Sequence, residues 1–160
     1  MKTQKTLLLL FLALVVGFSC SAQTKYEKAQ QGINTIVSIK ETPIGGTYFK
    51  VTLCDLTVLS TGVKASSVKV EYPREHYIGY IDKAELAGLV SGLKKIQKLL
   101  KETPDNNTTY VYRLTGGLWF YADNAVNIHV VFDDGDLYHN MDNVIELLEA
   151  AKNGDTSHSK

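Results

Sequence analysis

The chain has 160 residues, with 17 basic and 17 acidic side chains, two cysteines and a net charge of zero. This balance provides no basic surface for nucleic acid, so no nucleic-acid partner is expected. Two cysteines are too few for a disulfide-rich scaffold, and the length suits one domain built around a single hydrophobic core.

Residues 1–22 have the pattern of a signal peptide. Two lysines precede the apolar run Leu7–Val16, which is short for a membrane span, and small side chains follow it. Cleavage after Ala22 would release a soluble domain. Alternatively, a lipoprotein signal would end before Cys20, and lipidation of that cysteine would provide the only membrane attachment. Either route predicts an exported protein that is periplasmic, secreted or associated with the outer membrane.

The first half of the remaining chain predicts strands. Apolar and polar residues alternate in 33–40, 47–60 and 67–72, as they do in half-buried strands. The alternation slips near Cys54, where we expect a β-bulge. The polar segment 25–31 is expected to be a frayed start.

The strongest helical pattern extends from Tyr80 to Pro104. Asp82 is the expected N-cap, and Glu85 three positions later would complete a capping box. Thr103 precedes the proline, which disfavours further helical turns. Apolar side chains at the i, i+3, i+4, i+7 spacing predict one buried stripe, made of Leu86, Leu89, Val90, Leu93, Ile96 and Leu100.

The clearest strand pattern follows this helix. Residues 109–115, 118–122 and 125–132 are separated by short Gly-Gly and Asp-Asn turns, which predicts an antiparallel meander. One face of the meander is apolar and should pack on the long helix. Residues 141–151 predict a shorter amphipathic helix, and residues 155–160 a disordered tail.

Strands, helix, strands and helix therefore follow one another along residues 23–154. This order predicts a single α+β domain, in which an antiparallel sheet of about six or seven strands packs with one long and one shorter amphipathic helix. The two β-then-α halves are compatible with a distant duplication and with one continuous sheet. No residue-level repeat decides between them.

The meander has a second face that carries aromatic and polar side chains. Trp, Tyr and Arg are the residue types most enriched at interface hot spots, and aromatic platforms with polar neighbours also suit peptides and sugars. We therefore predict binding through this face, the alternative being that the second helix or the N-terminal strands cover it. The candidate binding residues are Arg113, Trp119, Tyr121, Asn127 and His129, flanked by Val111 and Val131.

Two segments, Tyr80–Leu86 and Thr109–Gly117, resemble uncharacterised small secreted proteins of Bacteroidetes-type bacteria. The resemblance covers about half of the chain after the signal and rests on capping and turn residues. It implies one exported domain, and it brings no activity, cofactor or site residue with it.

The leading functional hypothesis is a non-enzymatic domain that binds an unidentified protein, peptide or glycan partner. No catalytic, metal-ligating or cofactor-binding motif stands out, so we predict neither a metal nor a cofactor. A small periplasmic hydrolase is the alternative, and it would use His76 or His129 together with a carboxylate. The third hypothesis is an accessory lipoprotein anchored through Cys20.

Overall fold

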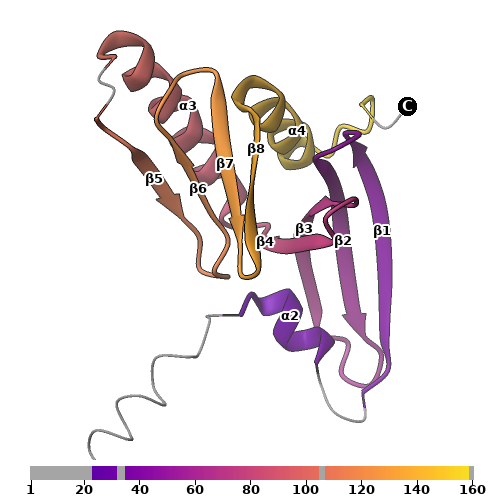
Figure 1. The fold of residues 1–160 in the computed structure, drawn as a ribbon. Coiled ribbons are helices and arrows are strands. Elements are labelled where there is room, and N and C mark those ends of the chain that lie inside the picture. Colours follow the sequence, from indigo (N-terminus) through magenta and orange to yellow (C-terminus); the bar gives the residue numbers. More distant parts are fainter. Residues whose placement is uncertain (1–22, 32–34, 105–106, 159–160) are drawn as a thin grey trace, which may run out of the picture.

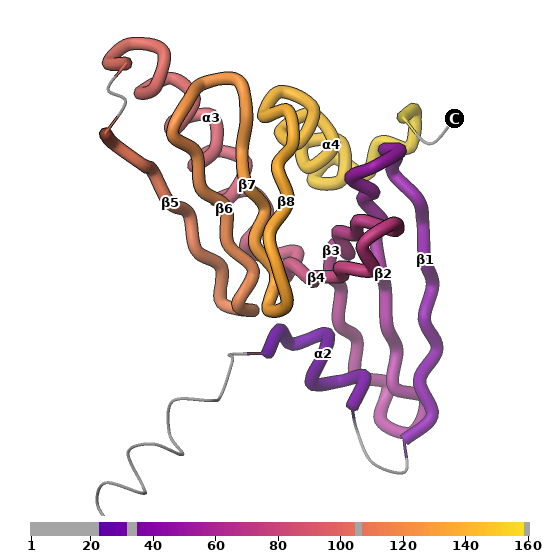
Figure 2. Tube along the Cα trace, viewed as in Figure 1, coloured from indigo at the N-terminus to yellow at the C-terminus, as the bar shows by residue number. Residues whose placement is uncertain are grey.

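The computed structural model describes residues 23–31, 35–104 and 107–158 (Figures 1 and 2). In these residues two antiparallel sheets of four strands each are accompanied by helices, which confirms the α+β class. The strands divide between two sheets instead of forming one. In chain order the elements are α2 (Lys25–Gln30), β1 (Val37–Gly45), β2 (Lys50–Val58), β3 (Lys64–Tyr72), β4 (Tyr77–Asp82), α3 (Leu86–Glu102), β5 (Tyr110–Arg113), β6 (Trp119–Ala122), β7 (Asn127–Phe132), β8 (Gly135–Asn140) and α4 (Met141–Asn153).

Each half of the chain is a four-stranded meander followed by a helix. The strand orders are β1-β2-β3-β4 and β5-β6-β7-β8, so neighbours in the sequence are neighbours in each sheet. Figure 1 shows α3 and α4 side by side behind the second sheet. Helix α4 contacts β1 and β2 of the first sheet as well as β7 and β8 of the second. The same architecture therefore occurs twice, and α4 joins the two halves.

The buried stripe of α3 lies in the main core, as its periodicity predicts. Every residue of the stripe is at most 7% exposed, and all belong to one cluster with inward-facing residues of both sheets. In the second sheet these include Phe120 and Ile128, both fully buried. Tyr112 of β5 lies against Gly92, where any side chain would overlap the tyrosine ring. This glycine allows β5 to approach the helix closely.

The start of α3 differs from the prediction. Residues 77–82 pair with β3 as strand β4, so the helix begins at Leu86 and Asp82 is not its N-cap. Glu85 occupies the cap position without a side-chain capping bond. Its carboxylate instead accepts hydrogen bonds from the Thr115 amide and hydroxyl, at 3.1 and 2.5 Å. Pairing with a neighbouring strand satisfies several backbone groups at once, which outweighs the single cap that the local sequence offers.

Two strand predictions were also wrong in detail. Residues 135–140, which no pattern predicted to be a strand, form β8 along β7, and the acidic turn at Asp133 and Asp134 just before them hides their alternation. The bulge expected near Cys54 does not occur, because β2 pairs with β3 in an unbroken register. An irregularity lies instead in the edge strand β1, between Pro43 and Gly45. Proline has no amide hydrogen to donate, so it interrupts pairing where it stands.

The segment predicted as a frayed start is helix α2. Thr24 caps the helix, and its capping box with Glu27 holds the first turn. Tyr26 is 1% exposed and stacks on Tyr80 of β4, with 5.0 Å between the ring centroids. The helix thus covers the outer face of the first sheet, where Cys54 and two apolar neighbours form a second, smaller cluster with Tyr26.

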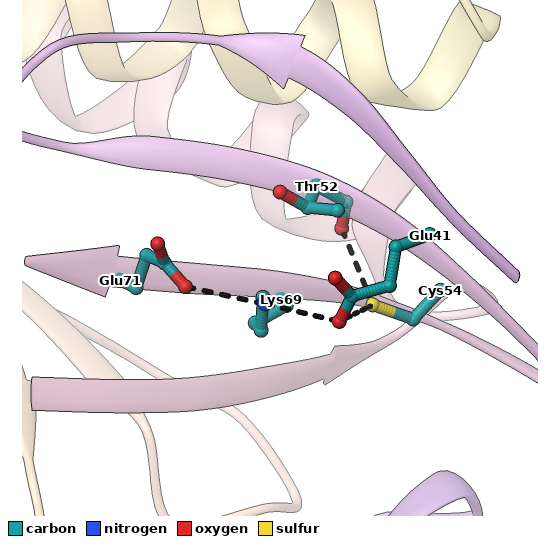
Figure 3. A network of polar contacts seen from close by, with 5 residues as sticks. All are labelled: Glu41, Thr52, Cys54, Lys69 and Glu71. Atoms are coloured by element: carbon teal, nitrogen blue, oxygen red, sulfur yellow. Dashed lines mark hydrogen bonds and ion pairs between the residues drawn. The ribbon is translucent and has the colours of Figure 1, made fainter. Parts of the chain in front are cut away.

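A polar network borders this second cluster (Figure 3). The Lys69 ammonium lies 3.0 Å from Glu41 and 3.2 Å from Glu71. Cys54 Sγ lies 3.9 Å from both a Glu41 carboxylate oxygen and the Thr52 carbonyl oxygen. Burial, together with the nearby Glu41 charge, raises the pKa of the Cys54 thiol. The thiol is therefore protonated and enclosed, as expected of a structural cysteine.

The end of the described chain lies against the domain. Gly154 is the left-handed C-cap of α4, with φ of 70°. Beyond it, His158 Nδ1 lies 3.5 Å from a Glu146 carboxylate oxygen. The backbone of His158 also lies close to Gly45 at the end of β1. At least the first part of the segment predicted as a tail thus contacts folded elements.

Candidate binding face

The predicted binding residues lie together on one face of the second sheet. In β6, Phe120 is buried in the core, whereas its neighbours Trp119 and Tyr121 point the other way and are half-buried. The same alternation along the adjoining strands brings the remaining predicted residues to this outer side, namely Arg113 on β5 and Asn127 and His129 on β7. Figure 1 shows this side of the sheet turned away from α3 and α4.

Strand register aligns the outer side chains in rows across the four strands. One row contains Arg113, Trp119, Val131 and Asp136, and the next contains Val111, Tyr121, His129 and Tyr138. We call the residues of these two rows the aromatic face. Asn127 lies in a third row, opposite Asn140 of β8.

The rings of the aromatic face contact one another in series. The Arg113 guanidinium lies 5.5 Å from the centroid of the Trp119 ring, and the Trp119 and Tyr121 centroids are 5.6 Å apart. Tyr121 stacks on the His129 imidazole at 4.3 Å, with 6° between the ring planes. Tyr138 meets the same imidazole edge-on at 4.9 Å. Aromatic pairs of this kind contribute about 0.5–1.5 kcal/mol each beyond burial, so they hold the rings in place.

Asp136 links the two rows. Its Oδ2 lies 2.9 Å from His129 Nδ1 and accepts a hydrogen bond from the Tyr121 hydroxyl at 3.2 Å. The hydrogen bond to His129, reinforced by that from Tyr121, holds the pKa of the Asp136 carboxyl below its ordinary value. Partial desolvation and the bond to Asp136 raise the pKa of the Tyr121 hydroxyl. At neutral pH the aspartate is therefore ionised and the tyrosine keeps its proton.

Replacing His129 with leucine is expected to raise the pKa of Asp136 toward the ordinary aspartate value of about 3.9, because the strongest partner of the carboxylate is lost. In the wild-type protein this interaction stabilises the fold above about pH 3.9, and the contribution is lost as the pH falls through the lower folded-state pKa. The NMR titration of the Asp136 carboxyl carbon measures the change. Asp155, whose pKa is lowered by hydrogen bonds from Ser157, is the internal control. Identical Asp136 titrations in both proteins would contradict the pairing.

No described helix covers the aromatic face. Helices α3 and α4 belong to the core cluster on the inner side of the second sheet, and α2 packs on the first sheet. The second helix, one of the elements that could have covered this face, thus lies on the opposite side. Val111 and Tyr138, on the two edge strands, are 46% and 53% exposed. Between these edges, Trp119, Tyr121 and His129 are half-buried by their neighbours on the same face.

One corner of the aromatic face is hollowed. An open depression of about 360 Å³ lies beside the β5–β6 turn, and it is lined by Arg113, Leu114, Thr115, Gly117 and Trp119. Gly117 has φ of +84°, a left-handed conformation that glycine adopts without strain. The depression has room for side chains of a partner but does not enclose them.

The other histidines are found in different surroundings. His76 lies in the β3–β4 turn with φ of 61°. The His139 imidazole contacts Phe49 and Tyr72 where the two halves meet, with centroids 5.7 and 6.0 Å apart. Within the described ranges, no three His, Cys, Asp or Glu side chains are grouped so that they could hold a metal ion. Of the two histidines proposed for a hydrolase, His129 has a carboxylate partner.

Asp136 and Tyr138 are the members of the aromatic face that sequence reasoning missed. Both lie on β8, which the acidic turn disguised. The signal that could have found them is their period-two alternation with Leu137 and His139, whose side chains are half-buried. Recognising that strand would have extended the predicted meander by one strand and completed the face.

No family model, curated protein or solved structure matches the chain. Cys20 and the predicted signal lie outside the described residues. In the part of the chain that the structure describes, no helix is both long and apolar enough to cross a membrane. The function therefore has to be argued from the aromatic face itself.

Proposed function

We propose that the protein is an exported, non-enzymatic domain whose partner docks on the aromatic face. The observation that carries the proposal is the unbroken series of contacts from Arg113 through Trp119, Tyr121 and His129 to Tyr138, on a face that no described helix covers. Arg, Trp and Tyr dominate binding energy at protein interfaces. Because the rings already hold one another in place, they lose little conformational entropy when a partner arrives.

A protein or peptide partner suits this surface better than a glycan. A sugar that stacks on an aromatic side chain needs a free ring face. Here Tyr121 and His129 cover one another with nearly parallel rings, and the Arg113 guanidinium lies over the ring of Trp119. These contacts leave fewer ring faces free for a sugar, whereas the arginine, tyrosine and histidine side chains suit the mixed surface of a polypeptide.

Alanine substitution of Trp119 or Tyr121 is expected to weaken partner binding at least tenfold, in line with truncation of an interface hot spot by about 2 kcal/mol or more. The processed protein, immobilised, would be used to capture partners from cell-envelope and culture-medium fractions, and affinities would be measured by titration. Trp119 is the only tryptophan, so its emission also reports docking. Tyr48→Ala, at a tyrosine 54% exposed beside β2, is the matched control. If Trp119→Ala and Tyr121→Ala bound every captured partner as tightly as the wild type and Tyr48→Ala, the proposal would be rejected.

The His129–Asp136 pair supports a second candidate, a small periplasmic hydrolase. The 2.9 Å contact meets the requirement that a carboxylate orient a histidine base. However, the imidazole also contacts the rings of Tyr121 and Tyr138, and Asp136 is half exposed on an open sheet. Hydrolysis of ester or amide substrates that His129→Leu abolishes would decide for this candidate.

The accessory-lipoprotein candidate concerns how the domain is attached, and it is compatible with binding through the aromatic face. Its support is the position of Cys20 after an apolar run. Radiolabelled fatty acid incorporated by the wild-type protein and not by Cys20→Ser would establish lipidation. Absence of label from both proteins would leave export by ordinary cleavage.

A further inference from the structure

We infer that the partner of the aromatic face is a second copy of this chain, held by a two-fold axis parallel to the strands of the second sheet. This inference rests on the proposed function and names its partner. It follows from the way charge, apolar surface and shape are distributed across the face, because a two-fold interface requires one surface to be complementary to itself.

Opposite charges stand at the two edges of one row. Arg113 lies on the edge strand β5, and Asp136 lies on the other edge strand, β8, in the same register row. The turn next to Asp136 adds two exposed carboxylates, Asp133 and Asp134. Between the edges the row contains only Trp119 and Val131. The face thus has one basic corner, one acidic corner and an aromatic centre.

A two-fold axis between β6 and β7, parallel to the strands, places each edge of one copy over the opposite edge of the other. Arg113 of one copy then meets Asp136 of the second, and Asp136 meets Arg113, so each contact occurs twice. In the next row the same rotation sets Val111 against Tyr138. An axis along the strands leaves the strands of the two sheets nearly parallel, within the range of about 30° that aligned facing sheets show. An axis perpendicular to the strands would set β5 over β5 and leave both corners without an opposite charge.

The shape of the two corners agrees with this arrangement. The depression lined by Arg113 and Trp119 lies at the β5–β6 turn, which the rotation brings over the β7–β8 turn of the other copy. That turn bears the acidic side chains of Asp133 and Asp134. The acidic turn of one copy would therefore face a hollow with an arginine on its wall.

The size of the face predicts a weak dimer. Four strands about 4.8 Å apart, each contributing a few residues, cover roughly 300–400 Å² per copy. A standard stable interface buries about 800 Å² per partner. We therefore expect a dimer that forms only at high protein concentration. Its complementary charges should determine which surfaces pair more than they raise the affinity.

Charge reversal tests this arrangement by sedimentation velocity of the processed protein over a range of concentrations. The wild-type protein should dimerise, and Arg113→Glu or Asp136→Lys alone should weaken the dimer at least tenfold, because each variant sets like charges together at both corners. An equimolar mixture of the two variants should restore wild-type association, since the glutamate introduced in one chain then faces the lysine introduced in the other. Lys95→Glu, an exposed charge reversal on α3, is the matched control and should dimerise normally.

Circular dichroism establishes that each variant folds, and Asp134→Lys replaces Asp136→Lys if the latter does not. A chain that stays monomeric at millimolar concentration, or a mixture that associates no better than its components, would overturn the inference. If that monomer still captures another polypeptide in a Trp119-dependent manner, only the second-copy partner is wrong and the proposed function stands. A dimer that is insensitive to both charge reversals and to Trp119→Ala would overturn the inference and show that association uses another surface.

Discussion

Replacing Phe120 with alanine is expected to lower the free energy of unfolding by about 3–5 kcal/mol, because a large side chain leaves a cavity in the core. Phe120 is fully buried on β6, in the cluster that contains Ile128 and the stripe of α3. A single domain is typically stable by about 5–15 kcal/mol. The substitution should therefore remove a large fraction of the total stability and move the urea midpoint far downward.

The adjacent Tyr121 provides the matched control, because its side chain points to the other side of the same strand. Tyr121→Ala loses the stacked contact with His129 and the hydrogen bond to Asp136, and we expect it to cost about 1–2 kcal/mol. Urea unfolding followed by far-ultraviolet circular dichroism compares the two variants. If Tyr121→Ala were as destabilising as Phe120→Ala, the outer face would not be the open surface that we describe.

Local periodicity accounts for what the sequence could predict. The apolar spacing from Leu86 to Leu100 places those side chains on one helical face whatever the rest of the chain does. The alternation along β6 and β7 likewise separates Phe120 from Trp119 and Tyr121 before any partner strand is known. The fold class and the members of the candidate face on β5, β6 and β7 followed from these patterns, whereas Asp136 and Tyr138 on β8 did not.

Features that depend on distant partners could not be predicted in this way. Asp82 has the local sequence of an N-cap, yet its backbone belongs to β4, because pairing with β3 is available only in the folded protein. Helix α2 is too short to be stable alone, since isolated helices below about 12–15 residues are marginal. It is stabilised by the packing of Tyr26 on the first sheet. The division of the strands into two sheets also depends on tertiary packing, which the alternation within individual strands does not specify.

Tyr26→Ala is expected to release α2 from the first sheet and to expose Cys54. Tyr26 is 1% exposed, it stacks on Tyr80, and Cys54 beneath it is fully buried. Loss of a buried aromatic ring costs about 3 kcal/mol or more, and most of that loss should fall on the local opening of this six-residue helix. Since about 1.4 kcal/mol corresponds to a tenfold change in an equilibrium, the rate of Cys54 labelling by a thiol reagent should rise about a hundredfold.

The pH dependence of labelling separates local opening from global unfolding. Burial raises the pKa of the Cys54 thiol, so closure of α2 is favoured while the thiol is protonated, and this advantage is lost as the pH rises above the thiol's ordinary pKa. Labelling should therefore accelerate with pH in the wild-type protein more steeply than the reagent's reaction with a free thiol. In Tyr26→Ala the extra steepness should be reduced, while the circular dichroism of the two sheets remains. Tyr48→Ala, at an exposed tyrosine, should label like the wild type. If Tyr26→Ala and the wild type labelled at equal rates, α2 would not be the element that shields Cys54 from the reagent.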